Sequence, residues 1–192
     1  LQCRGRNVNH IFGADSSTAV TQTAANIAGR ACLLRLLRFI RSLPGCENTC
    51  VVSLQPETAV RESYRILGET VITVEDYTSG RVFEDALCYA FYPVDLHTEE
   101  GCVPEPLQEG VVPSVPLRAL VPKGSRNLLV AGRSVSSDRL ANSALRVQAP
   151  AMAMGQAAGA VAVLAAQQGA TPLDVPLEQV KALLREHGAI VP

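Results

Sequence analysis

The pattern best suited to chemistry is an apolar run that ends in a glycine and leads, through a polar loop, into a helix of small residues. The apolar run covers residues 127–131, Gly132 follows it, and the helix is expected over about 142–168. A glycine at the carboxyl end of a buried parallel strand lets a ligand approach the backbone, and ligands bind at that end of open α/β sheets. The pattern therefore predicts a ligand site beside Gly132.

The expected helix begins near Asn142 or Ser143, and its first turn suits an anionic ligand. First-turn amides have no acceptor within a helix and lie at the positive end of its dipole. They stabilise negative charge that develops on a bound group. Gly155 and Gly159, four residues apart, share one helix face. Close packing against another backbone explains this pair as well as a ligand does.

The elements that position this site follow from the periodicity of the apolar residues. A long helix is expected over about 18–42, ended by Leu43-Pro44-Gly45. A C-terminal helix is expected to start near Asp174, as its cap, and to stop at Gly188. Strands are expected at four places between them. These are residues 51–54, 70–74, 86–92 and, at a sheet edge, 115–121.

Composition and charge argue against several classes of protein. The 192 residues carry 17 basic and 18 acidic side chains, a net charge of −1 that gives no support to a nucleic-acid partner. Hydrophobic residues make up 47% and charged residues 18%, which argues against disorder. The six cysteines include no C-x-x-C pair and no histidine at zinc-ligand spacing, so we expect no metal site. Buried or structural thiols are favoured, with a disulfide or metal pair as the alternative.

An uncharged stretch at 149–166 has the length of a membrane span but not the composition of one. It is rich in alanine and glycine and contains Pro150 and Gln156, so we expect a buried helix and no membrane. No signal-peptide pattern follows Leu1, which favours the cytoplasm. The chain lacks an initiator methionine, and we therefore expect that it is a fragment.

Several segments resemble one enzyme family. Val-Ala-Gly-Arg at 130–133, Arg-Leu-Ala-Asn-Ser-Ala-Leu-Arg-Val at 139–147 and Met-Gly-Gln-Ala-Ala-Gly at 154–159 resemble the C-terminal part of FAD-dependent oxidoreductases with a two-dinucleotide-binding fold. The blocks at 61–69 and 92–97 are similar to recurring blocks of that family. A more distant likeness is to the fumarate reductase, succinate dehydrogenase and L-aspartate oxidase flavoproteins.

The resemblance implies an α/β fold, namely the C-terminal part of an FAD/NAD(P)-binding, Rossmann-like fold with a β-rich substrate lobe. Residues 1–50 would be a helical segment of the FAD-binding fold, 51–126 the lobe, and 127–192 the last strand and helices of the FAD-binding fold. Such folds hold the ADP half of FAD on a Gly-x-Gly-x-x-Gly turn. No Gly-x-Gly occurs in this sequence, so the N-terminal phosphate-binding βαβ unit is expected to be missing.

The same resemblance assigns cofactor contacts. Two residues would lie beside the pyrophosphate or ribityl chain of FAD, and four would open the helix whose amides face the flavin. The first two are Gly132 and Arg133, and the other four are Asn142, Ser143, Ala144 and Leu145.

Three further side chains would lie near a small-molecule substrate. They are Arg61, His97 and Arg146. A histidine moves protons near neutral pH, and an arginine binds a carboxylate or an oxyanion. A structural role for His97 is as open as a catalytic one, and a plain ion-pair role is favoured for Arg61, which precedes Glu62. Asp138 is an alternative partner for Arg139 or Arg146.

The resulting hypothesis is a C-terminal fragment of a flavin-dependent oxidoreductase that transfers a hydride between an unknown small substrate and FAD. The isolated fragment is expected to be inactive and to bind FAD weakly or not at all. The alternative is a non-catalytic scaffold or subunit that docks onto a separate chain. The apolar surface that a truncated fold exposes would also favour self-association.

Overall fold

The computed structural model describes residues 10, 11, 13–96 and 104–192, and its internal contacts divide the chain into two units. The first unit is Leu1–Ser63 and the second is Tyr64–Pro192. His97 lies outside the described residues. The three-part domain division stays a prediction, and within this structure residues 51–63 are grouped with the first helix.

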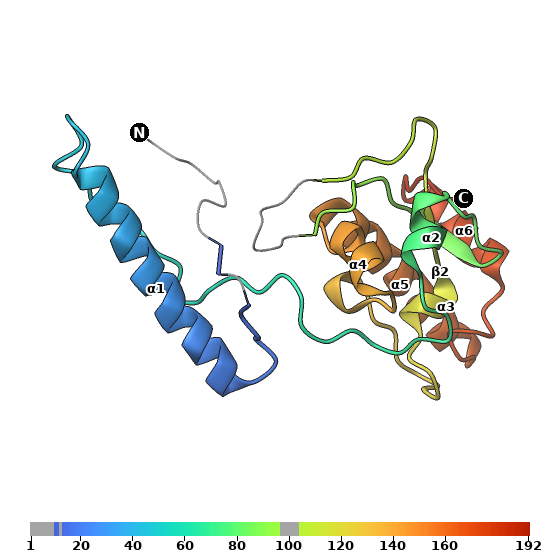
Figure 1. The fold of residues 1–192 in the computed structure, drawn as a ribbon. Helices are drawn as coiled ribbons and strands as arrows, with labels where there is room; N and C mark the ends of the chain where they lie inside the picture. Colours follow the sequence, from blue (N-terminus) through green and yellow to red (C-terminus); the bar gives the residue numbers. More distant parts are fainter. Residues whose placement is uncertain (1–9, 12, 97–103) are drawn as a thin grey trace. The chain divides into compact units, whose positions relative to one another are not determined.

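The first unit is built on one long helix, α1 (Ala19–Arg41), which confirms the helix expected there (Figure 1). Its start is fixed by a capping box, in which the Thr18 hydroxyl accepts a hydrogen bond from the Thr21 amide at 3.2 Å. The helix ends at Arg41, with Ser42 as its C-cap residue directly before the predicted stop at Leu43-Pro44-Gly45. Local signals therefore define both ends of α1.

An extended segment runs along one side of α1. The Thr58 amide donates to Asn26 Oδ1 at 2.7 Å, and Gln22 Nε2 donates to the Thr58 carbonyl at 3.1 Å. The strand predicted at 51–54 does not form, and Val52 is 92% exposed. A strand needs a paired neighbour, and among the described residues none pairs with this segment.

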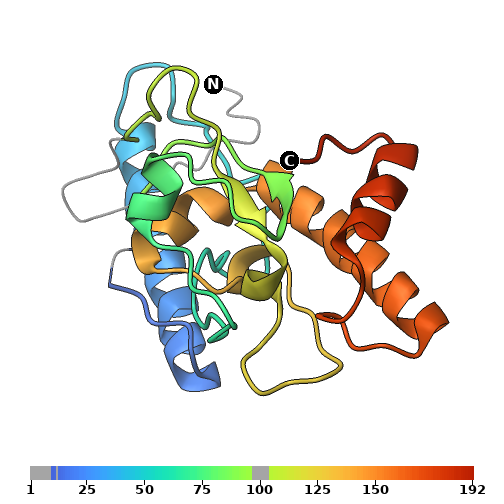
Figure 2. The same ribbon diagram turned by 90° about the vertical axis from the view of Figure 1, so that its right-hand side faces the viewer.

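The second unit is mainly helical with a small antiparallel sheet (Figures 1 and 2). Its elements are α2 (Val74–Thr78), β1 (Ala86–Tyr89), β2 (Ser114–Pro116), α3 (Leu117–Leu120), the 3₁₀ turn η1 (Gly132–Ser134), α4 (Arg139–Leu145), α5 (Gln148–Gln168) and α6 (Leu177–Glu186). Cys88 of β1 pairs with Val115 of β2. The prediction of a strand within 86–92 is confirmed in its first half.

Other predicted strands in this unit were wrong. Residues 70–74 contribute one parallel bridge, Ile72 to Ser137, before α2 begins. Residues 117–120 form α3 in place of most of the expected edge strand. Residues 127–131 form no strand, and Leu128 is 51% exposed. Their main hydrogen bond to the rest of the unit runs from the Val130 amide to the Leu120 carbonyl, 2.8 Å.

Two buried apolar clusters hold the second unit together. The first surrounds the sheet and α4, and includes Tyr77 and Leu145. The second joins α5 to α6, which lie side by side in Figure 2, through Val161 and Leu184. The C-terminal helix is thus confirmed, but Asp174 does not cap it, since its carboxylate accepts from the Thr171 hydroxyl and Pro176 is the N-cap residue.

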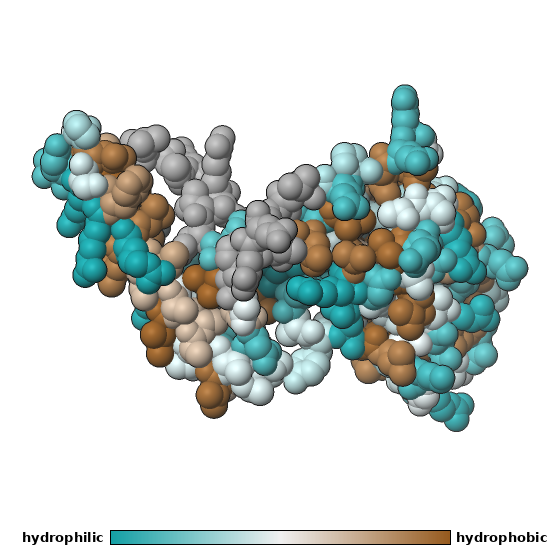
Figure 3. Space-filling model, viewed as in Figure 1, coloured by the Kyte–Doolittle hydropathy of each residue, from teal (hydrophilic) through white to brown (hydrophobic). Residues whose placement is uncertain are grey.

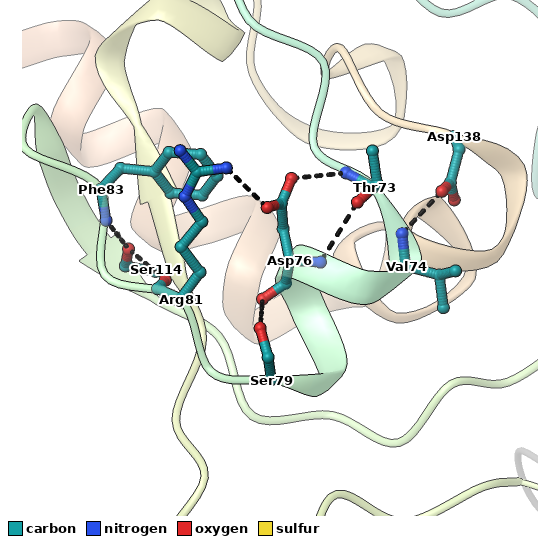
Figure 4. Close-up of polar contacts among 8 residues, drawn as sticks. All are labelled: Thr73, Val74, Asp76, Ser79, Arg81, Phe83, Ser114 and Asp138. Carbon is teal, nitrogen blue, oxygen red and sulfur yellow. Dashed lines mark hydrogen bonds and ion pairs between the residues drawn. The ribbon is translucent and has the colours of Figure 1, made fainter.

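A polar network fastens α2 to the sheet (Figure 4). Arg81 donates to Asp76 at 2.7 Å, and its guanidinium lies 4.5 Å from the centre of the Phe83 ring. The Ser114 hydroxyl accepts from the Phe83 amide and donates to the Arg81 carbonyl. Burial acts to raise the pKa of Asp76, but hydrogen bonds from Arg81 and Thr73 outweigh it, so the net pKa is lowered.

Among the described helices α5 alone is long and apolar enough to cross a membrane by length and composition. Its inner residues, among them Ala157 and Val161, nevertheless belong to the second cluster and are fully buried. A core helix passes the same test of length and composition, and here 28% of the apolar window is buried inside the structure.

Cys88 offers a direct test of this core. The side chain is buried in β1, and burial raises the pKa of its thiol to about 12. We expect iodoacetamide at pH 8 to alkylate the exposed Cys50 rapidly and Cys88 only after unfolding, as measured by peptide mass spectrometry. Because the folded pKa is raised, this thiol favours folding below the unfolded pKa, and that contribution is lost as the pH rises towards 12. Equal labelling rates in the native protein would contradict the packing.

Candidate functional site

Gly132 forms a turn that only glycine adopts readily. Its φ is +78°, in the left-handed region, and it opens η1 directly after the extended segment 127–131. A Cβ at this position would lie 3.8 Å from Ala151 Cβ, an ordinary contact. Backbone conformation, and not lack of space, therefore requires the glycine. The same distance shows that the turn lies against the first turns of α5.

The N-terminus of α5 is open. The helix begins at Gln148 after the extended residue Val147, and no side chain of the described residues caps it. Gln148 and Ala149 are exposed, and Pro150 in the first turn has no N–H to satisfy. The helix carries no charged residue along its whole length. Free amides and the positive end of a 21-residue helix therefore lie beside the Gly132 turn.

The prediction that Asn142 or Ser143 opens a helix was wrong. Asn142, Ser143, Ala144 and Leu145 lie inside α4, are fully buried, and are followed by a break at 146–147 before α5. The reason is Asp138, whose Oδ1 accepts from the Ala141 amide at 2.8 Å and starts α4 earlier. The uncapped first-turn amides thus belong to α5, six residues further along the chain than Asn142.

Asn142 ties α4 to the glycine turn. Its Nδ2 donates to the Arg133 carbonyl at 3.1 Å and to the Ser137 hydroxyl at 3.3 Å. Its Oδ1 is buried and has no partner among the described residues. The buried Asn142 side chain therefore holds the backbone of η1 at Arg133, the residue directly after Gly132.

Ser143 and Arg146 hold the backbone of Asp95. The Ser143 hydroxyl accepts from the Asp95 amide at 3.0 Å, and Arg146 Nη2 donates to the Asp95 carbonyl at 3.1 Å. Ser143 in turn donates to the Leu140 carbonyl at 2.6 Å, within α4. Both sides of residue 95 are thereby fixed to α4, two residues before His97.

The remaining predicted residues lie on the surface or in the first unit. Arg133 is exposed at the start of η1, so its side chain is accessible while its carbonyl is held by Asn142. Arg61 is half-buried in the first unit. The roles given to both, and to His97, stay predictions.

Sequence reasoning missed three contributors. Asp138 is an acidic cap that also accepts from the Val74 amide at 2.6 Å, a contact between distant segments (Figure 4). The sequence pattern places Gln148 and Ala149 in a helix interior, although Pro150 next to them is typical of a first turn. That proline was the local signal for a second helix start.

Comparison with known proteins identifies the family. The sequence model of a family described as FAD dependent oxidoreductase matches residues 3–184. No curated protein and no solved structure matches the chain. Because the family match spans nearly the whole sequence, the chain belongs to the FAD dependent oxidoreductase family.

Proposed function

We propose that this chain supplies the ring-side half of a flavin site in an oxidoreductase that transfers a hydride between a small substrate and FAD. The observation that supports this most is the contact between the Gly132 turn and the open N-terminus of α5. Family membership supports a flavin oxidoreductase in general. Hydride transfer and the binding of FAD by this chain go beyond family membership, and they are what we propose.

The residues present suit the ring side of FAD. The amides of Gln148 and Ala149 are neutral donors at a positive helix end, which matches a group rich in oxygen acceptors that gains negative charge on reduction. Gly132 presents backbone without a side chain beside them. Bound FAD would supply the hydride-accepting ring, and these residues would bind and orient it.

The phosphate side of FAD has no counterpart in the sequence. No Gly-x-Gly turn is present, and that turn is what lets a backbone approach a pyrophosphate. We propose that the phosphate-binding half comes from outside residues 1–192, either from further residues of the same protein or from a separate chain. In the latter case the protein is a subunit.

On the substrate side we propose a division of roles. Arg146 already donates to the Asp95 carbonyl, so it acts by positioning the segment that leads to His97. His97 moves a proton and Arg61 binds an anionic group of the substrate, as the family resemblance implies.

The test compares two flavins that differ in their phosphates. We expect the purified chain to bind riboflavin and FAD weakly and with similar dissociation constants, because only ring contacts lie on this chain. The measurement is quenching of flavin fluorescence, confirmed by protein NMR shifts. FAD binding that is tenfold or more tighter than riboflavin binding would show a phosphate site and contradict the proposed half-site.

A matched pair of variants locates the binding. Ala149→Asp places a negative charge in the first turn of α5, and Gln167→Asp places one at the exposed far end of the same helix. We expect the first to weaken binding of the anionic reduced riboflavin about tenfold, the oxidised neutral form less, and the second to change neither. Equal effects of both variants would remove the α5 N-terminus from the site.

A scaffold without flavin chemistry is the second candidate. It is favoured by the exposed Leu128 and by the uncharged outer side of α5, where Met152 is 75% exposed. Such a surface suits a docked protein. If neither flavin binds at millimolar concentration, this second candidate replaces the first.

A further inference from the structure

One side of α1 carries a regular stripe of exposed residues to which the flavin proposal gives no role. Hydrophobic residues reach the surface along α1 (Figure 3). The stripe residues are spaced alternately four and three apart, and all of them are exposed. We call them the outer stripe: Val20, Ala24, Ile27, Ala31, Leu34 and Arg38.

The other side of α1 is already covered. Ala25 is buried there, and the side chains of Gln22 and Asn26 bind the extended segment at Thr58. The outer stripe is therefore a second apolar face, with Val20 80% and Ile27 66% exposed. A helix that is apolar on both sides is stable in water only when both sides are covered.

The spacing of the stripe indicates what covers it. Alternating steps of four and three residues keep side chains on one narrow seam of a helix, which is the pattern of the a and d positions in a coiled coil. A helix on a membrane surface has a similar spacing, but its apolar face carries large hydrophobic residues, whereas two of the six stripe residues are alanines and one is an arginine. The stripe therefore suits another helix.

The order of large and small residues suits a second copy of α1 in the antiparallel direction. If Ile27 faces the partner's Ala31, then Leu34 faces the partner's Ala24 and Val20 faces the partner's Arg38. In each of the two central pairs a bulky side chain meets an alanine, so the two helices can approach closely. In the outer pair the arginine stem can lie along the valine while its charge stays in water.

Charge selects the same direction. Four arginines, Arg30, Arg35, Arg38 and Arg41, lie in the second half of α1, and no acidic residue occurs between Asp15 and Glu47. A parallel pair would bring the two arginine-rich halves together, whereas an antiparallel pair separates them. It also places the exposed carboxylate of Asp15, which precedes α1, near the partner's arginine-rich end.

We propose that the outer stripe of α1 is the interface of a symmetric homodimer in which the two α1 helices pack antiparallel. The proposal does not depend on flavin binding. It assigns the outer stripe to a second copy of this chain.

The first experiment measures mass in solution. Sedimentation velocity of the chain, from about 1 to 100 µM, should show a species of twice the 20.4 kDa monomer mass. Ile27→Glu should raise the dimer dissociation constant about 100-fold, because it buries two unpaired carboxylates per dimer. Val52→Glu is the control, since Val52 is 92% exposed in the same unit but lies off the stripe. Both variants should keep the wild-type circular dichroism spectrum.

The second experiment tests the direction. Ala31→Leu should weaken an antiparallel dimer about tenfold because the new leucine would then face the partner's Ile27, and adding Ile27→Ala should restore it. A parallel dimer would place the two introduced leucines against each other and would not be weakened. A monomer at every concentration, a dimer unaffected by Ile27→Glu, or stripe-dependent binding to anionic vesicles by a monomer would each overturn the proposal.

Discussion

Gly68→Ala is expected to lower the free energy of unfolding of the second unit by about 3 kcal/mol. A Cβ at position 68 would lie 2.7 Å from Ser136 Cβ and 3.0 Å from the Arg118 carbonyl oxygen. Neither neighbour is the far end of a flexible side chain, so backbone must move. The Gly68 amide also donates to Ser136 Oγ at 2.9 Å, and Gly68 pairs with Pro122, so the shift would disturb several bonds at once.

Urea unfolding followed by circular dichroism measures this loss, and Gly155→Ala provides the matched control. Gly155 lies in α5 and a Cβ there would meet nothing within 4 Å. Alanine is the better helix former, so this variant should be more stable by up to about 1 kcal/mol. The close approach at Gly68 would be refuted by two variants of equal stability.

Asp138→Ala is expected to cost about 3 kcal/mol in the same assay. The carboxylate accepts from the Ala141 amide at 2.8 Å and from the Val74 amide at 2.6 Å, and thereby caps α4 while holding the start of α2 (Figure 4). Removing it leaves two amides without their acceptors. Asp138→Asn keeps one accepting oxygen and should fall between wild type and alanine.

A second aspartate separates this effect from general loss of charge. Asp174 accepts only a surface hydrogen bond from the Thr171 hydroxyl among those described, so Asp174→Ala should cost about 0.5 kcal/mol or less. Similar losses at positions 138 and 174 would show that the double cap does not stabilise the unit. The Asp138 variants should also weaken flavin binding, because α4 carries the Asn142 contact to the Arg133 carbonyl.

Elements with local signals were predictable from the sequence. The Thr18 cap and the Pro44-Gly45 stop define α1, and the apolar spacing of 177–186 defines α6. The β-rich run at β1 predicts its strand correctly, since Ser114–Pro116 supplies the partner that the strand needs. The sequence singled out Gly132 as a point of close backbone approach after an apolar run, but it did not predict the left-handed φ of +78°.

The rest depends on contacts between distant residues. Residues 127–131 have the pattern of a strand, but a strand forms only with a neighbour, and within the described residues the segment bonds to Leu120 alone through Val130. The start of α4 depends on Asp138, which also accepts from Val74, so its importance could not be read from nearby residues. The prediction of open amides at Asn142–Leu145 failed for this reason, and the open amides lie at Gln148 and Ala149 instead.

The hold of α4 on residue 95 has a dynamic consequence. Because Ser143 fixes the amide and Arg146 the carbonyl of Asp95, a tilt of the short helix cannot occur without carrying that peptide along. NMR relaxation dispersion should then report one shared exchange rate for Val94, Asp95 and the residues of the helix. Ser143→Ala would remove the bond to the amide and leave only the Arg146 bond to the carbonyl, so we expect Asp95 then to exchange at a rate different from that of the helix while the overall fold persists.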